Sequence, residues 1–385
     1  MTAVAPLAGL VAVELGTSVA GPTGTQILAE LGVEVIKIEN PNGGDDARLW
    51  GPPFVNGSSP TFHAINRNKK SAAIDLKNEN ERAALRAFII DRADIVLQNL
   101  RPGLVEHYGL DAKSLRAEKP SLVYCNLAAF GSSGPLAKNP GYDPLMQAFG
   151  GIMSITGREG EEPVRVGPSV IDQGAAMWSA IGVLAALYRR KETGEGCEVG
   201  TSLYETSLSW ITAQFCTYFA SGKLPRRMGT ENFGIAPYKA YQALDGWIVI
   251  AAGNNNLFQR LAGALGHPEW VNDPQMLTNP DRVTHRERLN ALIADEIIKE
   301  PMDSWIDKLG AAGVPCAPVL TFDKIAAHPQ FEATGMRQQH PDSPIPLMGI
   351  PLQFDGERPP LRNVSPALGN ATNDILGVQT KRAAE

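Results

Sequence analysis

The chain has 385 residues, 43% of them apolar, and a formal net charge of −6 at pH 7. This length suffices for two domains, or for one large domain with an insertion, and the apolar fraction can supply a sizeable core. The negative charge argues against a general nucleic-acid surface but allows local basic pockets for an anionic small molecule. The 4 cysteines form no CxxC pair, so they indicate neither a zinc site nor a disulfide framework and fit the reducing cytoplasm.

The apolar N-terminus, MTAVAPLAGLVAVELG, favours a first strand over a signal peptide. It lacks a basic region and is interrupted by Pro6, Gly9 and Glu14. The chain contains no run of 18 consecutive apolar residues, so the sequence predicts no membrane span.

Strands and helices alternate through the first 130 or so residues. The pattern predicts strands at 10–15, 33–39, 71–76, 95–98 and 122–127, with helices at 23–31 and 80–91. The first strand, helix and second strand make a βαβ unit. Repetition of this unit favours a parallel α/β sheet in the first half of the chain.

Two helix starts are predicted in the middle of the chain. Asp143 followed by Pro144 is a common helix opening, with the aspartate as N-cap and the proline at the first helical position. A long apolar helix is predicted from about Gly174 to Lys191, because its last turn is basic and Gly194 follows as an exit residue.

A second unit is predicted after a helical linker at 201–224. Residues 239–253 have the pattern of a hairpin with Asp245-Gly246 as a type I′ turn. Predicted helices follow at 255–265, 282–299 and 303–313, and a short strand pair is predicted within 345–356. We therefore expect a smaller α+β domain at 225–320 and a second linker at 321–330.

The first βα loop does not carry a dinucleotide-binding fingerprint. Gly16, Gly21 and Gly24 are spaced five and three residues apart instead of two and three, although Glu39 ends the second strand where a ribose-binding acid would lie. We expect neither a nicotinamide nor a flavin cofactor. A loop ahead of a helix can still bind a phosphate-bearing ligand. The nearby cations serve either that ligand or the solvated surface; they are Lys69, Lys70, Lys77, Arg101 and His107.

Asp172 lies just before the predicted long helix and has two possible roles. It can cap the helix, or it can act as a nucleophile whose ionised form is favoured by the helix-end N–H groups, by roughly 0.3–1 kcal/mol at an exposed site. Position alone leaves both open. The histidines show no HxxxH spacing and no serine lies in a GxSxG elbow, so serine-hydrolase and zinc-hydrolase hypotheses are weak and no metal is expected.

Five further segments follow one another along the chain: GVEVIKIENPNGGDDAR, NRNKKSAAIDLK, NLRPGLVEHYGL, GYDPLMQAFGGIMSITG and ETGEGCEVGTSL. In this order and over nearly the whole chain they resemble the family III CoA-transferases of the CaiB/BaiF type, which include formyl-CoA:oxalate and carnitine CoA-transferases. In that family an aspartate about thirty residues after the tyrosine of the GYD segment is the nucleophile. Tyr142 and Asp172 are 30 residues apart here, so the resemblance implies that Asp172 is catalytic.

The resemblance also implies the substrates. CoA would move from an acyl-CoA, with succinyl-CoA as a candidate donor, to a small carboxylic acid through mixed anhydrides and an aspartyl-CoA thioester. Its implied CoA contacts are Val19, Ala20, Asn40, Ile74, Asp75, Leu76, Lys77, Asn99, Leu100, Arg101, His107, Asn139, Pro140, Gly141 and Tyr142. We expect the loop 229–234 to cover Asp172, with Gly229, Thr230, Glu231 and Asn232 as its substrate-contacting residues. Val19, Asn40 and His107 stand where the formyl-CoA enzyme has glutamine, arginine and arginine.

The implied fold is a Rossmann-like large domain at 1–200, completed by 325–385, plus the small domain, in an interlocked homodimer without membrane or nucleic-acid partners. An α-methylacyl-CoA racemase is the nearest alternative. The racemase pattern has a histidine between glycine and aspartate (GHD), whereas this chain has Tyr142 between Gly141 and Asp143. Moving an α-proton needs a base, and a phenol is mostly protonated at neutral pH. A non-enzymatic CoA-binding protein is the other alternative, and it would keep its role in Asp172→Ala.

Overall fold

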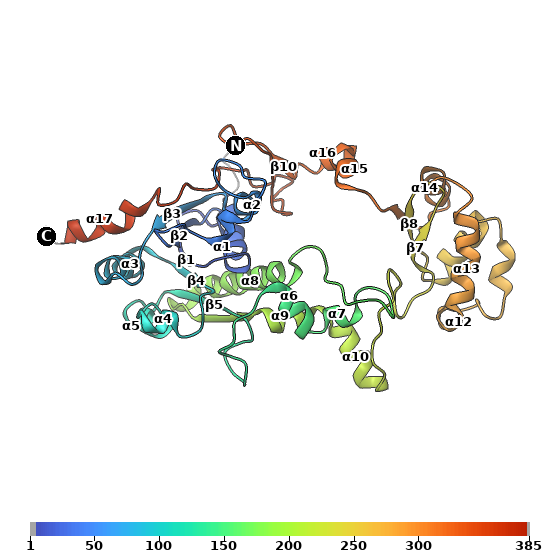
Figure 1. Cartoon of the computed structure of the whole chain (residues 1–385), viewed down its shortest axis with the longest axis horizontal. Coiled ribbons are helices and arrows are strands. Elements are labelled where there is room, and N and C mark those ends of the chain that lie inside the picture. The colour runs from blue at the N-terminus through green and yellow to red at the C-terminus, as the bar shows by residue number, and fades with distance from the viewer. Residues whose placement is uncertain (1–4, 383–385) are drawn as a thin grey trace. The chain divides into compact units, whose positions relative to one another are not determined.

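The computed structural model describes residues 5–382 of the chain (Figure 1). These residues form two compact units. Unit 1 comprises residues 5–152, 165–222 and 329–382, and unit 2 comprises residues 153–164 and 223–328. Each unit has a sheet and a hydrophobic core of its own.

Unit 1 is built on a six-stranded parallel sheet with the order β3-β2-β1-β4-β5-β6. Its strands are β1 (Val11–Leu15), β2 (Glu34–Glu39), β3 (Lys69–Ala73), β4 (Ile95–Gln98), β5 (Val123–Ala128) and β6 (Glu198–Ser202). The predicted α/β class with a parallel sheet is confirmed. The strand order reverses between β1 and β4, and open α/β sheets bind ligands beyond the carboxyl ends of the strands near such a point.

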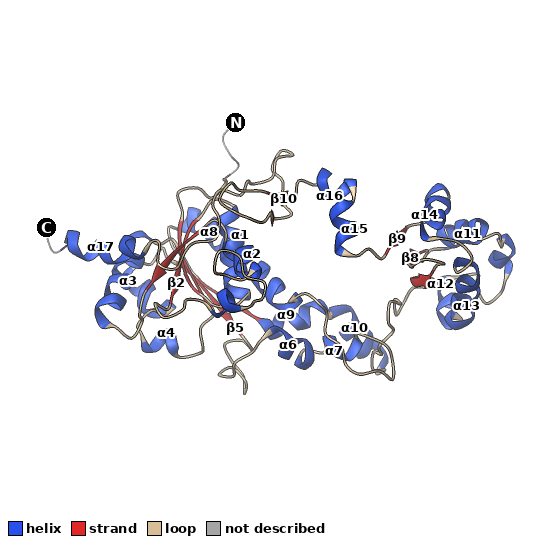
Figure 2. Ribbon diagram, turned by 45° about the horizontal axis from the view of Figure 1, so that its top comes forward, coloured by secondary structure: helices blue, strands red, loops and turns tan. Residues whose placement is uncertain are grey.

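The helices of unit 1 are η1 (Asp46–Leu49), α1 (Ala20–Glu30), α2 (Pro60–Asn66), α3 (Glu79–Arg92), α4 (Leu104–His107), α5 (Ala112–Glu118), α6 (Asp143–Phe149), α8 (Val170–Thr193), α9 (Leu203–Trp210), α10 (Thr212–Ser221), α16 (Pro329–Ala333) and α17 (Thr372–Arg382). Helices α1 and α8 pack against one face of the sheet, and α3 and α5 pack against the other (Figure 2). A short antiparallel pair, β10 (Arg337–Gln338) and β11 (Leu347–Met348), also belongs to unit 1.

Strand residues alternate between the two cores of unit 1, as expected for a pleated strand with helices on both sides. Ala12 of β1 packs in one core with Leu28 of α1 and Val183 of α8. Its neighbour Val13 packs in the opposite core with Phe88 of α3. All five side chains are buried, so the first strand is fixed from both faces.

Several predicted boundaries in unit 1 are wrong by a few residues. Helix α1 starts at Ala20 instead of residue 23, because the turn-forming Pro22 fits the first turn of a helix. Helix α8 starts at Val170, so Asp172 lies inside its first turn and is not its N-cap. Strand β6 was not predicted, since its sequence, EVGTS, has a glycine and little apolar character.

Unit 2 contains an antiparallel sheet with the order β7-β8-β9 beside a group of helices. Its elements are β7 (Tyr238–Gln242), β8 (Trp247–Ala251), β9 (Cys316–Pro318), α11 (Asn255–Ala264), η2 (Pro268–Asn272), α12 (Asn279–Thr284), α13 (Arg286–Ile297), α14 (Met302–Ala311) and α15 (Phe322–Ala327). Helix α7 (Ile152–Ile155) spans the change from unit 1 to unit 2. The helix predicted at 282–299 is two helices, interrupted at His285.

The predicted hairpin of unit 2 exists, but its type I′ turn is wrong. Gln242 pairs with Trp247, so four residues join the two strands. Neither Asp245 nor Gly246 has the positive φ that a type I′ turn requires. Asp245 instead accepts a hydrogen bond of 2.8 Å from the backbone N–H of Met302, which ties the loop to α14.

The domain to which residues 153–164 belong and the pairing of the strand near Leu347 both differ from the predictions. Residues 153–164 were expected in the large domain, yet they join unit 2, where the Gly229 N–H donates to the Gly157 carbonyl at 2.7 Å. The predicted strand pair within 345–356 is also wrong, because Leu347 pairs with Gln338 of β10 outside that range.

The C-terminal segment returns to unit 1 and covers the free edge of β3. The N–H of Ala371 donates to the Ser71 carbonyl at 2.7 Å, and the N–H of Ser71 donates to the Asn370 side chain at 2.8 Å. Figure 1 shows α17, at the red end of the colour scale, beside α3 and β3. Residues from both ends of the chain therefore complete one sheet.

Candidate active site

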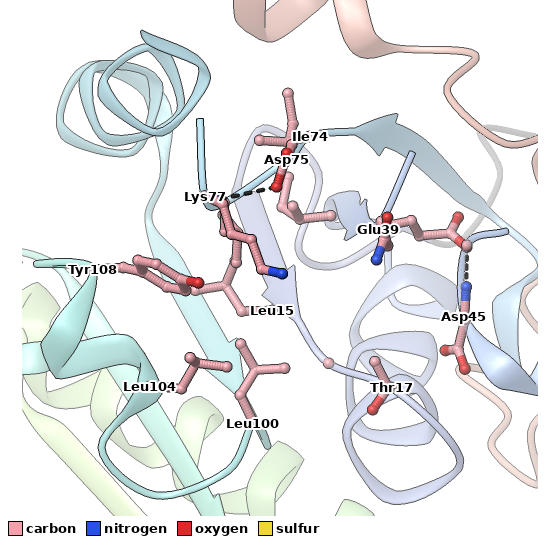
Figure 3. A pocket seen from close by; sticks show the side chains of 15 residues that line it. Leu15, Thr17, Glu39, Asp45, Ile74, Asp75, Lys77, Leu100, Leu104 and Tyr108 are labelled. Carbon is pink, nitrogen blue, oxygen red and sulfur yellow. Dashed lines mark hydrogen bonds between the residues drawn. The ribbon is translucent and has the colours of Figure 1, made fainter. Parts of the chain in front are cut away.

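A pocket of about 210 Å³ opens at the carboxyl ends of strands β1, β2 and β3 in unit 1 (Figure 3). We call it the unit 1 pocket. It is lined by Leu15, Gly16, Thr17, Ile38, Glu39, Asn40, Gly44, Asp45, Ile74, Asp75, Leu76, Lys77, Leu100, Leu104 and Tyr108. This place matches the rule for ligand sites in open α/β sheets.

The unit 1 pocket brings together part of the CoA contacts expected from the sequence. The expected residues that line it are Asn40, Ile74, Asp75, Leu76, Lys77 and Leu100. Asn99 is not in the lining; its side-chain amide bonds both backbone groups of Thr17, which lines the pocket, at 2.9 and 3.0 Å. Arg101 and His107 are exposed outside the lining, and Tyr108 lines the pocket instead of His107.

The remaining expected contacts lie elsewhere in unit 1. Val19 is the N-cap residue of α1 and Ala20 is its first residue. Asn139 and Pro140 are exposed ahead of α6, and Tyr142 is 59% exposed, so it does not pack into a core. None of these residues, nor Gly141, is in the lining of the unit 1 pocket.

One cation of the unit 1 pocket has no carboxylate partner. Figure 3 shows the Lys77 side chain extending toward the centre of the pocket. Lys77 is exposed and forms no ion pair with the residues that the structure describes; only its backbone N–H bonds the Asp75 carboxylate, at 3.0 Å. The apolar wall around it comes from Leu15, Leu100 and Leu104. The pocket thus offers an apolar surface and a free ammonium group.

A buried network of charges lies beneath the rim of this pocket. Lys37 contacts the carboxylates of Glu14 at 2.7 Å and Asp45 at 2.8 Å, and Lys69 contacts Glu14 at 2.8 Å. All four side chains are fully shielded from solvent. Burial alone would raise the pKa of Glu14, but the two lysines hold it at about 2. Burial lowers the pKa of Lys69 to about 8, against the opposing effect of Glu14.

This network positions the backbone that lines the pocket. The Lys37 ammonium donates to the Gly16 carbonyl at 2.7 Å, and Asp45 accepts from the N–H of Ser18 at 3.1 Å. Ser18 has a φ of 66°, which is unusual for a residue with a side chain and is held by these contacts. Sequence reasoning missed the network and treated Lys69 as a ligand or surface group. The sequence feature that could have indicated the network is the presence of charged residues within apolar strands.

Glu39 and Arg48 form an ion pair with each other, so neither is free to bind a ligand. The Arg48 guanidinium donates to the two Glu39 oxygens at 2.7 and 2.8 Å, and Ser71 donates to the same carboxylate at 2.6 Å. Arg48 also lies over the ring of Phe62, 3.8 Å from its centroid. The position of Glu39 at the end of β2 therefore does not make it a ribose ligand, and Arg48 is not free for a phosphate.

Asp172 is half-buried in the first turn of α8, and its helix is capped by a carboxylate from another helix. Asp143 accepts hydrogen bonds from the backbone N–H groups of Ile171 at 2.7 Å and of Asp172 at 3.2 Å. The Gln147 side chain donates to Asp143 at 2.5 Å. The prediction that Asp143 caps its own helix is wrong, because it is the first residue of α6 and points to α8.

The surroundings of Asp172 disfavour its charge. Burial, and secondarily the carboxylate of Asp143, raise the pKa of Asp172 to about 7. The helix-end N–H groups that were expected to favour its ionised form bond Asp143 instead. No cation of the described chain counters the effect. A carboxyl group that titrates near neutrality in a partly buried position is a candidate nucleophile or base.

The expected substrate loop belongs to unit 2 and is fixed by hydrogen bonds. Gly229 bonds the Gly157 carbonyl at 2.7 Å, Thr230 accepts from the Ala240 N–H at 2.9 Å, and Asn232 donates from its N–H to Tyr238 at 3.2 Å. Glu231 accepts from both Lys239 and Arg286. Gly229, Thr230 and Glu231 line a second pocket of about 620 Å³, which lies wholly in unit 2 and is called the unit 2 pocket.

Residues 5–382 contain no group of three or more His, Cys, Asp or Glu side chains that could hold a metal ion. Helix α8 alone in that range is long and apolar enough to cross a membrane by length and composition. Half of its apolar window is buried inside the protein.

Comparisons with known proteins agree over nearly the whole length. The model of CoA-transferase family III matches residues 7–372. A succinate–glutarate CoA-transferase from Agrobacterium fabrum is 35% identical over 96% of this chain and 95% of that protein. An acetyl-CoA:oxalate CoA-transferase from Acetobacter aceti is 35% identical over 91% and 90% of the two chains. The crystal structure of a CAIB/BAIF family protein from Brucella suis is similar with a TM-score of 0.85 and 37% identity, over 98% and 99% of the chains.

Proposed function

The chain belongs to CoA-transferase family III, and we propose that it moves CoA from an acyl-CoA such as succinyl-CoA to a small dicarboxylic acid, with Asp172 as nucleophile. The relatives named above act on glutarate and on oxalate, which are both dicarboxylic acids. The observation that carries the proposed mechanism is the partly buried Asp172 carboxyl group, whose pKa is raised to about 7.

The chemistry follows from that carboxylate. Ionised Asp172 attacks the thioester carbonyl of the donor, so a mixed aspartyl-acyl anhydride forms and CoA thiolate leaves. The thiolate attacks the aspartyl carbonyl, which releases the donor acid and leaves CoA bound to Asp172 as a thioester. The acceptor carboxylate attacks this thioester, and CoA thiolate then attacks the acyl carbonyl of the second anhydride. The new acyl-CoA leaves and Asp172 is again a carboxylate.

The buried position of Asp172 suits this sequence. A desolvated carboxylate without a counter-ion is a stronger nucleophile than one that is ion-paired or fully hydrated. Low exposure also limits hydrolysis of the anhydrides. Asp143 bonds the backbone of Asp172 and leaves its side-chain oxygens free to react.

CoA is proposed to bind in the unit 1 pocket through Asn40, residues 74–77 and Leu100. Lys77 supplies the free cation for a CoA phosphate. The other CoA contacts expected from the sequence remain part of the proposal; they are Val19, Ala20, Asn99, Arg101, His107, Asn139, Pro140, Gly141 and Tyr142. The substrate loop Gly229–Asn232 is proposed to contact the acceptor acid.

A homodimer is also proposed. Helix α8 exposes large apolar side chains, among them Ile181 at 52% and Tyr188 at 73%, and α10 exposes Phe219 at 75%. Exposed apolar side chains of this size are suited to contact with another protein surface, and light scattering of the purified chain will give its mass. The described cysteines are free, which fits a reducing compartment such as the cytoplasm.

The test is mass spectrometry of the protein after incubation with succinyl-CoA and hydroxylamine. We expect a donor-dependent hydroxamate at Asp172, and a loss of activity of about 10⁴-fold or more in Asp172→Ala. Asp303→Ala is the matched control, because Asp303 also lies in the first turn of a helix but is exposed in unit 2. Full turnover of several donors by Asp172→Ala would rule out the proposal. Deuterium wash-in at the α-carbon without an acceptor acid would instead indicate a racemase.

A further inference from the structure

Gln147 is a fully buried polar side chain on α6, within unit 1. Its amide nitrogen donates to Oδ1 of Asp143 at 2.5 Å, and its amide oxygen accepts from the backbone N–H of Val166 at 2.8 Å. An ionised carboxylate only accepts hydrogen bonds and a backbone N–H only donates, so these partners fix which end of the amide faces which. The side chain therefore joins two segments of unit 1 in one orientation.

The Asp143 carboxylate is held by N–H donors on both of its oxygens. Oδ1 accepts from Gln147, and Oδ2 accepts from the backbone N–H groups of Ile171 at 2.7 Å and Asp172 at 3.2 Å. Asp143 is 2% exposed, so solvent does not readily replace a donor that is removed. Without the Gln147 amide, Oδ1 would be buried and unbonded. The carboxylate would then turn or take up a proton, and either change alters its contact with α8.

The start of α8 depends on this carboxylate. Ser169, the N-cap residue, makes no side-chain hydrogen bond to the helix. Asp143 accepts from the first-turn N–H groups in its place. Val166 ties the segment that enters α8 to Gln147. Gln147 therefore holds the first turn of α8 in two ways, directly through the entry segment and indirectly through Asp143.

The direction of the Asp172 side chain follows from the backbone of this turn. No residue between 5 and 382 donates a hydrogen bond to its carboxyl oxygens, which feel only burial and the charge of Asp143. The backbone N–H of Asp172 is bonded to Asp143. Attack on a thioester carbonyl needs aligned reacting atoms, and a misplacement of about 1 Å can cost about 100-fold in rate. Loss of the contacts that fix the turn should therefore slow the reaction.

We propose that Gln147 is a positioning residue of the transfer reaction: it orients Asp143, and Asp143 orients the turn of α8 that presents Asp172. The inference rests on the proposed function, in which Asp172 is the nucleophile. Gln147 is fully buried, so it acts through Asp143 and not on the substrate. A glutamine that served packing alone would change stability without changing the rate of the chemical step.

The test measures kcat and KM of Gln147→Met with succinyl-CoA and glutarate. Methionine is similar in length but has neither the amide donor nor the amide oxygen. We expect kcat to fall by roughly 10- to 100-fold, and KM for succinyl-CoA to change by less than about twofold. Hydroxamate formation at Asp172 in a single turnover should slow by roughly the same factor as kcat. The rates are measured at pH 8, where Asp172 of the wild type is mostly ionised because its pKa is about 7.

Gln26→Met is the matched control. Gln26 is also a buried glutamine on a helix of unit 1, and its amide donates at 3.4 Å to Glu30, a carboxylate four residues away along α1. Both substitutions remove a buried amide, and urea denaturation measures what each costs in stability. We expect kcat of Gln26→Met to stay within about twofold of the wild-type value.

A double-mutant cycle tests whether Gln147 acts through Asp143. In an Asp143→Ala background the amide has no carboxylate to orient, so Gln147→Met should change kcat by less than about twofold. Val166→Pro tests the other contact, because it removes the N–H that the Gln147 oxygen accepts and leaves the buried side chain intact. Its kcat should also fall, by a smaller factor than in Gln147→Met.

A folded Gln147→Met protein with wild-type kcat would overturn the inference, because the amide would then serve stability alone. Equal losses of kcat in Gln147→Met and Gln26→Met would show a general effect of removing a buried amide. Equal losses with and without Asp143 would show that Gln147 does not act through that carboxylate. If Gln147→Met does not fold, wild-type kcat in Val166→Pro is sufficient to overturn the inference.

The wild-type hydroxamate distinguishes this inference from the proposed function. If the hydroxamate forms at Asp172 and the variants react at the wild-type rate, only the role of Gln147 is removed. If it never forms in the wild-type protein, the proposed function is removed and the role of Gln147 with it.

Discussion

Beneath the unit 1 pocket Lys37 lies within 2.8 Å of both Glu14 and Asp45, whereas on unit 2 Arg158 and Arg227 line a pocket without a carboxylate in contact. The first set is buried, its positive and negative charges are paired with each other, and it holds the backbone of Gly16 and Ser18 in place. The second set is at least partly exposed to solvent and has no carboxylate partner. Charges that are paired and buried serve the architecture, and charges that are left unpaired at a pocket mark where a ligand of opposite sign binds.

The largest effect is expected from a substitution in the buried network of charges. Glu14→Gln leaves Lys37 and Lys69 without their shared counter-ion, so the free energy of unfolding should fall by about 3–5 kcal/mol. Urea denaturation measures the change. Glu34→Gln removes an exposed pair of the same 2.7 Å length with Lys70, and it should cost less than about 1 kcal/mol. Similar losses in the two variants would contradict the distinction between buried and exposed pairs.

A smaller effect on stability is expected from Asp172, whose carboxylate has no cationic partner. The pKa of Asp172 is raised from 3.8 to about 7, so the folded state binds the proton more tightly than the unfolded state. Stability should therefore fall as the pH rises from about 4 to 7 and then level off. Asp172→Asn lacks this loss, and its melting temperature should exceed that of the wild type by a margin that widens over this range. A margin independent of pH would show that Asp172 is not desolvated.

The smallest effect concerns Asp143. In the wild type, kcat/KM for the acyl-CoA should rise with pH through a midpoint near 7, because the ionised form of Asp172 reacts. Asp143→Asn removes the neighbouring negative charge and keeps an oxygen for the helix N–H groups, so the midpoint should move to lower pH. The shift should be partial, since burial is the larger cause. Asp111→Asn, which alters a cap on α5, should leave the midpoint unchanged.

Much of the sheet could be predicted from local patterns. Strand β4 has the predicted bounds, because Ile95–Gln98 is a short apolar run buried on both faces. Strand β3 was predicted two residues late, because it begins with Lys69, whose charge is neutralised by Glu14, 55 residues away. A strand that depends on such a distant partner gives no local apolar signal.

The candidate site was predictable only in part, because its contacts also join residues that are distant in the sequence. Asp172 could be named from its spacing to Tyr142 through a family resemblance, but that resemblance gave no information on its surroundings. The contact from Asp143 to the backbone of Ile171 joins residues 28 positions apart. Arg158 lies in a segment that was expected in the large domain, and folding brings that segment to Gly229 in unit 2.

The C-terminal segment along β3 has a consequence for synthesis on the ribosome. Ser71 emerges about 300 residues before Asn370, its hydrogen-bond partner across the strand edge. During translation β3 is therefore an uncovered edge strand, and such edges pair readily with other chains. The nascent protein depends on the completion of its last segment to close the sheet that its first residues began.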